Sequence, residues 1–206
     1  MFQRISSLIL LFCLTAALLP HGNAAAANQK PEHFANSDVE AYIEEYLYGM
    51  DEEQGNRLYR ESREHSGRVY LTESSVLQIC SAGQRLFALT RESGKSVISC
   101  LDLETWQWNR VTETVAEISR FAVAGSRLYY LADEAIFYRD LDTGHSSALL
   151  RREGLSRFWL AGPDLVDYML ADGNVVYRYH TTTGEITSYT NPKSALKTSS
   201  SVSVQR

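Results

Sequence analysis

Three residues of this chain have types that could form a binding site: Arg120, Arg157 and Trp159. Arg120-Phe-Ala-Val and Arg157-Phe-Trp-Leu each place an arginine before an apolar run, as two related strands would. If both strands are innermost in their sheets, the two guanidinium groups point toward one central cleft and could hold an anion. Trp159 could offer its ring to a sugar or an aromatic ligand. The alternative is that both arginines lie at a rim and pair with nearby acids.

Signatures of catalysis and metal binding are missing from the sequence. It contains no G-x-S-x-G, H-E-x-x-H or C-x-x-C motif and no phosphate-binding glycine loop. Asp142, His145 and Ser146 lie in one short segment, which cannot hold a base rigidly between nucleophile and carboxylate as a triad requires. We therefore expect no catalytic residue, no metal and no cofactor, and the sequence favours a binding protein over an enzyme.

One acidic motif superficially resembles a calcium loop, but its recurrence indicates a structural turn. Asp140-Leu-Asp-Thr-Gly lacks the third acid and the distal glutamate of such a loop. Asp102, Asp140 and His180 precede Thr105, Thr143 and Thr183 by three residues, and these threonines are 38 and 40 residues apart. A short acid at this position caps free backbone N–H groups. We predict a turn at each of the three sites.

A second motif recurs with the first and points to the architecture. Its form is G-x-[RD]-L-[apolar]. A period near 40 residues built from short apolar runs is typical of four-stranded propeller blades. Runs such as Leu128-Tyr-Tyr-Leu131 are apolar on both faces, as a sheet buried between two neighbours requires. The motif occurs at Gly55-Asn-Arg-Leu-Tyr, Gly83-Gln-Arg-Leu-Phe, Gly125-Ser-Arg-Leu-Tyr and Gly162-Pro-Asp-Leu-Val.

Gly125-Ser-Arg-Leu-Tyr-Tyr-Leu followed by Ile136-Phe-Tyr-Arg-Asp-Leu-Asp-Thr-Gly resembles the propeller repeats of bacterial exported proteins, such as the quinoprotein-like and lipoprotein-receptor-like families. The resemblance covers residues 76–190 and implies an all-β, propeller-like array. The regular alanine and docking tryptophan that follow Thr-Gly in quinoproteins are absent, so quinone binding is not carried over to any residue.

The remaining segments complete the predicted organisation. Val39, Tyr42, Ile43, Tyr46 and Leu47 have the 3.6-residue spacing of an amphipathic helix, preceded by a Ser-x-x-Glu capping box. Either strands of a degenerate blade or a charged helix could follow it, and we favour the strands. The predicted segments are a signal peptide (1–27), a loose linker (28–36), an amphipathic helix (37–49), a degenerate first blade or linker (50–75), three clear blades (76–190) and a disordered tail (191–206).

Composition and charge argue against some classes of binding partner. The chain has 20 basic and 25 acidic residues, and no basic stripe that nucleic acid or an anionic membrane would need. The apolar core of residues 8–19 is too short to span a bilayer and suits export, most simply to a bacterial periplasm or the extracellular space. Retention of this segment as an anchor is the alternative. We expect a protein partner, with a small anionic or sugar ligand, and pairing of two open arrays into a homodimer, as alternatives.

Cys80 and Cys100 remain after removal of the predicted signal peptide, and an exported pair invites a disulfide. The repeat places them on the first and third strands of one blade, about 9.6 Å apart at a strand spacing of about 4.8 Å. A disulfide tolerates about 7 Å between Cα atoms. We therefore predict two buried thiols.

Trp106 and Trp108 are predicted on one face of an outer strand. Aromatic residues on strands ordinarily pack between blades, because each buries a large area. A stacking surface for a sugar is the alternative.

Overall fold

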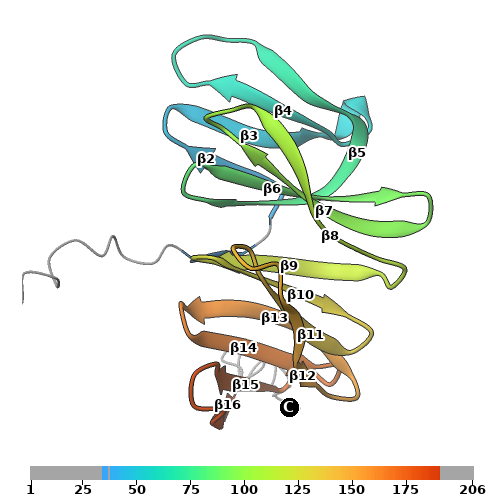
Figure 1. The fold of residues 1–206 in the computed structure, drawn as a ribbon, viewed down its shortest axis with the longest axis vertical. Helices are drawn as coiled ribbons and strands as arrows, with labels where there is room; N and C mark the ends of the chain where they lie inside the picture. The colour runs from blue at the N-terminus through green and yellow to red at the C-terminus, as the bar shows by residue number, and fades with distance from the viewer. Residues whose placement is uncertain (1–33, 37, 191–206) are drawn as a thin grey trace, which may run out of the picture. The chain divides into compact units, whose positions relative to one another are not determined.

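A computed structural model describes residues 34–36 and 38–190, and the strands of these residues form an all-β array of antiparallel sheets (Figure 1). The predicted fold class is therefore confirmed. Residues 1–33, 37 and 191–206, which include the predicted signal peptide and tail, lie outside the described part. Among the residues described, no helix has the length and apolar character needed to cross a membrane.

The first blade is complete, with four strands. Its outermost strand continues without a break into the innermost strand of the second blade, because residues 68–75 of β5 pair with β4 and residues 76–82 pair with β6. This continuity makes the two blades one seven-stranded sheet. The strands of the first blade are β2 (Glu40–Ile43), β3 (Tyr46–Asp51), β4 (Arg57–Ser62) and the start of β5 (Arg68–Ala82), with the short helix η1 (Glu52–Gln54) between β3 and β4.

The helix predicted over residues 37–49 is wrong, because this segment forms the hairpin of β2 and β3. Ala41 and Ile43 alternate with exposed residues along β2, which is the two-residue period of a strand. The five apolar residues at helical spacing are split by a two-residue turn at Glu44 and Glu45, where Glu44 has φ 55°. Tyr42 and Ile43 in the first arm and Tyr46 and Tyr48 in the second are β-branched or aromatic residues, which favour a strand.

Gly49 shows why the residue predicted to end a helix lies inside a strand. A Cβ atom at this position would lie 2.6 Å from the hydroxyl oxygen of Tyr59 on the neighbouring strand β4. Glycine is therefore needed so that the tyrosine ring can lie against the backbone of β3.

The second, third and fourth blades confirm the three predicted over residues 76–190. Each is an antiparallel four-stranded meander, and the predicted strands differ from the observed ones by a few terminal residues. The strands are β6 (Arg85–Glu92), β7 (Lys95–Asp102) and β8 (Gln107–Thr114) after β5; β9 (Ile118–Ala124), β10 (Arg127–Ala132), β11 (Ala135–Asp140) and β12 (Ser146–Arg151); and β13 (Leu155–Gly162), β14 (Leu165–Leu170), β15 (Val175–His180) and β16 (Ile186–Thr190).

The end of the predicted loose linker is also a strand. β1 (Phe34–Asn36) pairs antiparallel with β9 and adds a fifth strand to the third blade. The side-chain amide of Asn36 then accepts from Leu160 N at 2.7 Å and donates to Leu160 O at 3.2 Å, both on β13 of the fourth blade. β1 therefore fastens the third blade to the fourth.

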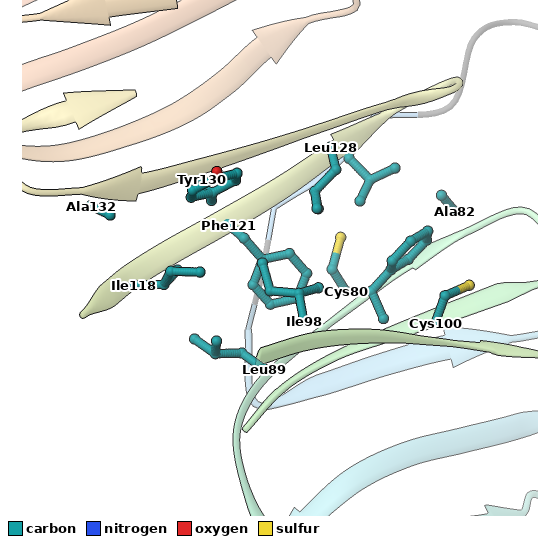
Figure 2. Packing of buried hydrophobic residues seen from close by; sticks show 12 residues of the cluster. Cys80, Ala82, Leu89, Ile98, Cys100, Ile118, Phe121, Leu128, Tyr130 and Ala132 are labelled. Carbon is teal, nitrogen blue, oxygen red and sulfur yellow. The ribbon is translucent and has the colours of Figure 1, made fainter. Parts of the chain in front are cut away.

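Successive blades pack face to face through three buried clusters. One joins the first and second blades, one the second and third, and one the third and fourth. Figure 2 shows the middle cluster, where Phe121, Leu128 and Tyr130 of the third blade lie opposite Cys80 and Ile98 of the second. Among the described residues, no buried cluster or strand ladder joins the first blade to the fourth. The clusters and ladders of the described residues therefore join each blade to its neighbours in the sequence.

The prediction of two buried thiols is confirmed. Cys80 and Cys100 are both free and buried, and both register with Phe87, which lies on the strand between them. Burial raises the pKa of Cys80 to about 12 and that of Cys100 to about 11. Both side chains are therefore neutral thiols near pH 7 and act as small apolar groups.

Candidate functional site

A groove opens between the first and second blades because the second blade lacks an aromatic pair that later blades carry. Tyr130 and Phe137 stack in the third blade with ring centroids 5.2 Å apart, and Tyr168 and Tyr177 stack in the fourth at the same distance. Each pair is the fourth rung of the ladder between the second and third strands of its blade. The fourth rung in the second blade is the pair Ala88 and Ser99. Two small side chains thus replace two rings.

The space left by these rings is a cavity of about 260 Å³, here called the Trp108 groove. Its apolar surface comes from Leu71, Ala88 and Trp108, and hydroxyl groups surround it. Trp108 on β8 is 36% exposed, so much of its indole is available to a ligand. The full lining is Leu71, Thr72 and Ser74 from β5; Ala88, Thr90 and Glu92 from β6; Ser99 from β7; and Trp108 from β8.

Charges beside the groove are already paired with one another. Glu92 accepts from Arg110 Nη2 at 2.6 Å and from Thr90 Oγ1 at 3.1 Å. Arg110 also donates to Glu113 at 2.6 Å, and Lys95 donates to Glu113 at 2.9 Å. The hydrogen bonds from Lys95 and Arg110 lower the pKa of Glu113. The groove therefore offers apolar surface and hydroxyls, which suits binding better than proton transfer.

The prediction that Trp106 and Trp108 share one face of a strand is wrong for Trp106. It lies in the turn before β8 with φ 57°, and its ring contacts Arg60 of the first blade, whose guanidinium carbon is 4.5 Å from the ring centroid. The same guanidinium carbon lies 4.7 Å from the centroid of Tyr46. Trp106 therefore helps to join two blades, whereas Trp108 lines the groove.

The two arginines proposed from the sequence occupy equivalent positions in successive blades, but they lie on opposite sides of the fourth blade. Arg120 registers with Leu131 on β10, whose side chain packs in the cluster between the third and fourth blades. Arg157 on β13 registers with Met169, and its neighbour Phe158 packs toward the third blade. Arg157 therefore lies on the opposite face of the fourth blade.

Trp159 shares the face of Arg157, because two residues separated by one position on a strand point the same way. It registers with Asp167, a buried residue on that face. Trp159 and Arg157 thus lie on one side of the fourth blade, and Arg120 lies on the side of the third blade that faces the fourth. Among the described residues, Arg120 and Arg157 form no ion pair within 4 Å.

The recurring turns have the geometry predicted for them. Asp102 accepts from the backbone N–H groups of Glu104 and Thr105 at 2.9 and 3.0 Å, and Asp140 accepts from Thr143 N at 2.7 Å. These backbone hydrogen bonds lower the pKa of both carboxyls. His180 Nδ1 accepts from Thr182 N at 3.4 Å. In the described part of the chain, no three His, Cys, Asp or Glu side chains are arranged to hold a metal.

Sequence reasoning missed the groove because small residues leave no signal by themselves. Ala88 and Ser99 become informative only when the blades are aligned and Tyr130 and Phe137 are seen to occupy the same two positions. Leu71 was assigned to the degenerate blade, but its packing depended on the two inner strands that were predicted as a helix.

The described fold is similar to solved β-propellers. The N-terminal domain of Nup159 is 14% identical with a TM-score of 0.56, and the match covers 79% of this chain and 46% of that one. TolB from Acinetobacter baumannii is 15% identical with a TM-score of 0.56, covering 77% and 44%. A chain in the structure of S. cerevisiae Dbp5 bound to Nup159 and Gle1 is 14% identical with a TM-score of 0.56, and the match covers 80% of this chain and 48% of that one.

Identities this low show the fold alone, and the chain spans about half the length of these structures. The sequence matches no protein-family model and no curated protein.

Proposed function

We propose that this chain is an exported, non-catalytic binding module that receives a side chain of a protein partner in the Trp108 groove. The observation that carries the proposal is the replacement of a stacked aromatic pair by Ala88 and Ser99 beside an exposed tryptophan. An aromatic or aliphatic side chain of a partner would restore the packing that the other blades make internally. Tryptophans that become buried when a partner binds are frequent hot spots of protein interfaces.

Two further observations support a protein partner. The rigid blades place the groove on strands, where its geometry is held by neighbouring ladders and clusters. Nup159, which has a similar fold, is bound to Dbp5 in a solved complex. Export rests on the sequence of residues 1–27, and the mass of the mature protein after expression in a bacterium tests it. Loss of about 27 residues is expected, whereas an uncleaved chain that stays in the cytoplasm would contradict export.

The test of the groove uses peptides selected from a random phage-displayed library against the full chain. Trp108→Ala should weaken the selected peptides about thirtyfold, because hot-spot residues contribute about 2 kcal/mol or more. Ser99→Phe, alone or with Ala88→Tyr, should block them by filling the groove. Trp159→Ala is the matched control and should leave affinity unchanged, because this ring lies on the fourth blade, outside the groove lining. Fluorescence polarisation measures the affinities.

Two outcomes would overturn the proposal. One is the absence of any selected peptide, and the other is peptides that bind the Trp108→Ala and Ser99→Phe variants as tightly as the wild type. A second candidate is a carbohydrate, because Trp108 lies among the hydroxyls of Thr72 and Thr90. Oligosaccharides tested against the same variants would reveal it if they bind and the peptides do not.

A further inference from the structure

A second pocket lies between the third and fourth blades and shares no residue with the Trp108 groove. Its volume is about 130 Å³, and we call it the Tyr129 pocket. It is lined by Arg127, Tyr129, Tyr138 and Leu149 of the third blade and by Thr181, which follows β15 of the fourth. An inference from it is independent of the function proposed above.

The hydroxyl of Tyr129 is buried in this interface and has no hydrogen-bond acceptor among the described residues, whereas the donors Arg127 and Thr181 lie beside it. The residue is 1% exposed, and its oxygen is inaccessible to solvent. A buried hydroxyl that makes no hydrogen bond is unfavourable, so it is usually satisfied by water or by a ligand. Burial raises the pKa of Tyr129, an effect that nearby Arg127 and Thr181 oppose, so the hydroxyl is protonated near pH 7 and can donate.

Arg127 supplies the positive charge of the pocket. Among the described residues, it has no ion-pair partner within 4 Å. The pKa of Arg127 is raised chiefly by its hydrogen bond with the Tyr129 side chain and less by the charge of Asp164, which also adds to the burial that raises the pKa of Tyr129. Asp164 is exposed and accepts from Thr181 Oγ1 at 3.3 Å. The field of the pocket is therefore suited to a singly charged anion rather than to a doubly charged one.

The equivalent pocket between the second and third blades lacks both of these hydroxyls, although arginines and an asparagine also line it. Phe87 stands there at the position of Tyr129, and Leu141 stands at the position of Thr181. Arg85 stands at the position of Arg127, but its Nη2 donates to the carbonyl oxygen of Gly125 at 3.1 Å. The Tyr129 pocket thus has hydroxyls at two positions where the equivalent pocket has apolar side chains.

The pocket is also larger than a single water requires. A water molecule occupies about 30 Å³ in the liquid. The available 130 Å³ can hold several waters or one small ligand. A ligand with two oxygen acceptors could accept from the Arg127 fork and the Tyr129 hydroxyl together.

We propose that the Tyr129 pocket binds a carboxylate group, which accepts hydrogen bonds from the Arg127 guanidinium and the Tyr129 hydroxyl, with the Thr181 hydroxyl at the edge. The carboxylate can belong to a small organic acid or to an acidic or C-terminal residue of a peptide. The binding is non-covalent, and no bond is made or broken.

Acetate is the probe of the shared chemistry. The ¹⁵N-labelled full chain is titrated with acetate at constant ionic strength, and amide shifts are followed by NMR. Saturable shifts are expected around Arg127, Tyr129 and Thr181. Tyr129→Phe should weaken acetate about tenfold or more, because a hydrogen bond to a charged acceptor is lost. Tyr168→Phe is the matched control, since it removes the other unsatisfied buried tyrosine hydroxyl, and should bind acetate as the wild type does.

Further arms separate the sources and guard against misfolding. Arg127→Gln should also weaken acetate, and unchanged spectra away from the pocket show that the fold is intact. Sulfate should bind more weakly than acetate, and a peptide ending in a free carboxylate should bind more tightly than its amidated form if the source is a peptide. Absence of saturable shifts, or equal acetate affinity in Tyr129→Phe and wild type, would overturn the proposal and leave only water in the pocket.

Discussion

In three of the blades, an aspartate carboxylate stabilises a turn by accepting hydrogen bonds from backbone N–H groups. Asp140 accepts hydrogen bonds from Thr143 N and Thr143 Oγ1 at 2.7 and 2.8 Å, and from Asp142 N at 3.1 Å. Asp102 does the same in the preceding blade, and Asp51 accepts from Glu53 N and Gln54 N in the first. Each carboxylate satisfies N–H groups that the adjacent strand leaves free.

The hydrogen bonds that Asp140 accepts predict that the folded state loses stability as the pH falls. The pKa of Asp140 is below its ordinary value of 3.8, chiefly through the backbone hydrogen bond from Thr143. The carboxylate therefore stabilises the fold above that value, and this contribution is lost as the pH falls through the lowered pKa. In Asp140→Asn, an amide oxygen still accepts the backbone bonds, so the loss of stability between pH 7 and pH 3 should be smaller than in the wild type. Urea unfolding at several pH values measures this.

Asp142→Asn is the control in the same turn. It leaves the capping carboxylate of Asp140 in place, so its acid dependence should follow the wild type. If Asp140→Asn and wild type lose equal stability on acidification, the carboxylate does not act through these hydrogen bonds.

At the scale of elements, short strand β1 has a role that its three residues do not suggest. Its side-chain amide at Asn36 imitates a backbone peptide and pairs with both polar groups of Leu160. Leu160 is buried, so its N–H has little access to water if the partner is removed. A segment at the start of the described chain thereby connects two blades that lie far along the sequence.

Asn36→Ala should lower the free energy of unfolding by about 1–3 kcal/mol, because it leaves the buried Leu160 N–H unsatisfied. Asn109→Ala, on exposed β8, is the matched control and should change stability by no more than about 0.5 kcal/mol. Chemical denaturation checks both variants. Equal small effects would mean that β1 is held by its ladder with β9 alone.

At the scale of the whole described molecule, each blade is stabilised by packing against its neighbours. The second and third blades have a packed cluster on both faces, whereas the fourth contributes to one of the three clusters. Its opposite face carries Asp167, which is bound by both Arg178 at 2.7 and 2.9 Å and Tyr189 at 2.6 Å. The first blade similarly pairs Asp51 with Arg68 and Tyr70 on the face away from the second. Polar groups on terminal faces are typical of repeat arrays.

This arrangement predicts that the fourth blade opens before the middle ones. Phe158→Ala removes a fully buried ring from the cluster between the third and fourth blades and should cost about 3–5 kcal/mol locally. Hydrogen exchange followed by mass spectrometry should show faster exchange in β14 and β15, while β6 and β7 keep their protection.

Phe121→Ala, in the middle cluster, is the comparison for that experiment and should affect the blades on both sides of it. Uniform acceleration across all four blades in Phe158→Ala would contradict a nearest-neighbour array and indicate one cooperative unit.

The sequence by itself determined the blades from residue 76 onward, the capped turns and the free cysteines. These follow from local patterns that repeat, such as the spacing of Thr105, Thr143 and Thr183, and repetition makes each weak signal count several times. It failed at residues 37–49, which have no second copy, and where five apolar residues satisfy a helix and a tight hairpin equally well.

Only the tertiary structure decided the sites. The Trp108 groove exists because Ala88 and Ser99 occupy a position that rings fill in other blades, and the Tyr129 pocket has hydroxyls because Tyr129 and Thr181 stand where the equivalent pocket has Phe87 and Leu141. Likewise, the sequence placed Arg120 and Arg157 around one cleft, but in the structure Arg120 faces the fourth blade and Arg157 lies on the far face of that blade. A cavity is a property of two facing surfaces, and one strand's sequence does not contain the surface that it will meet.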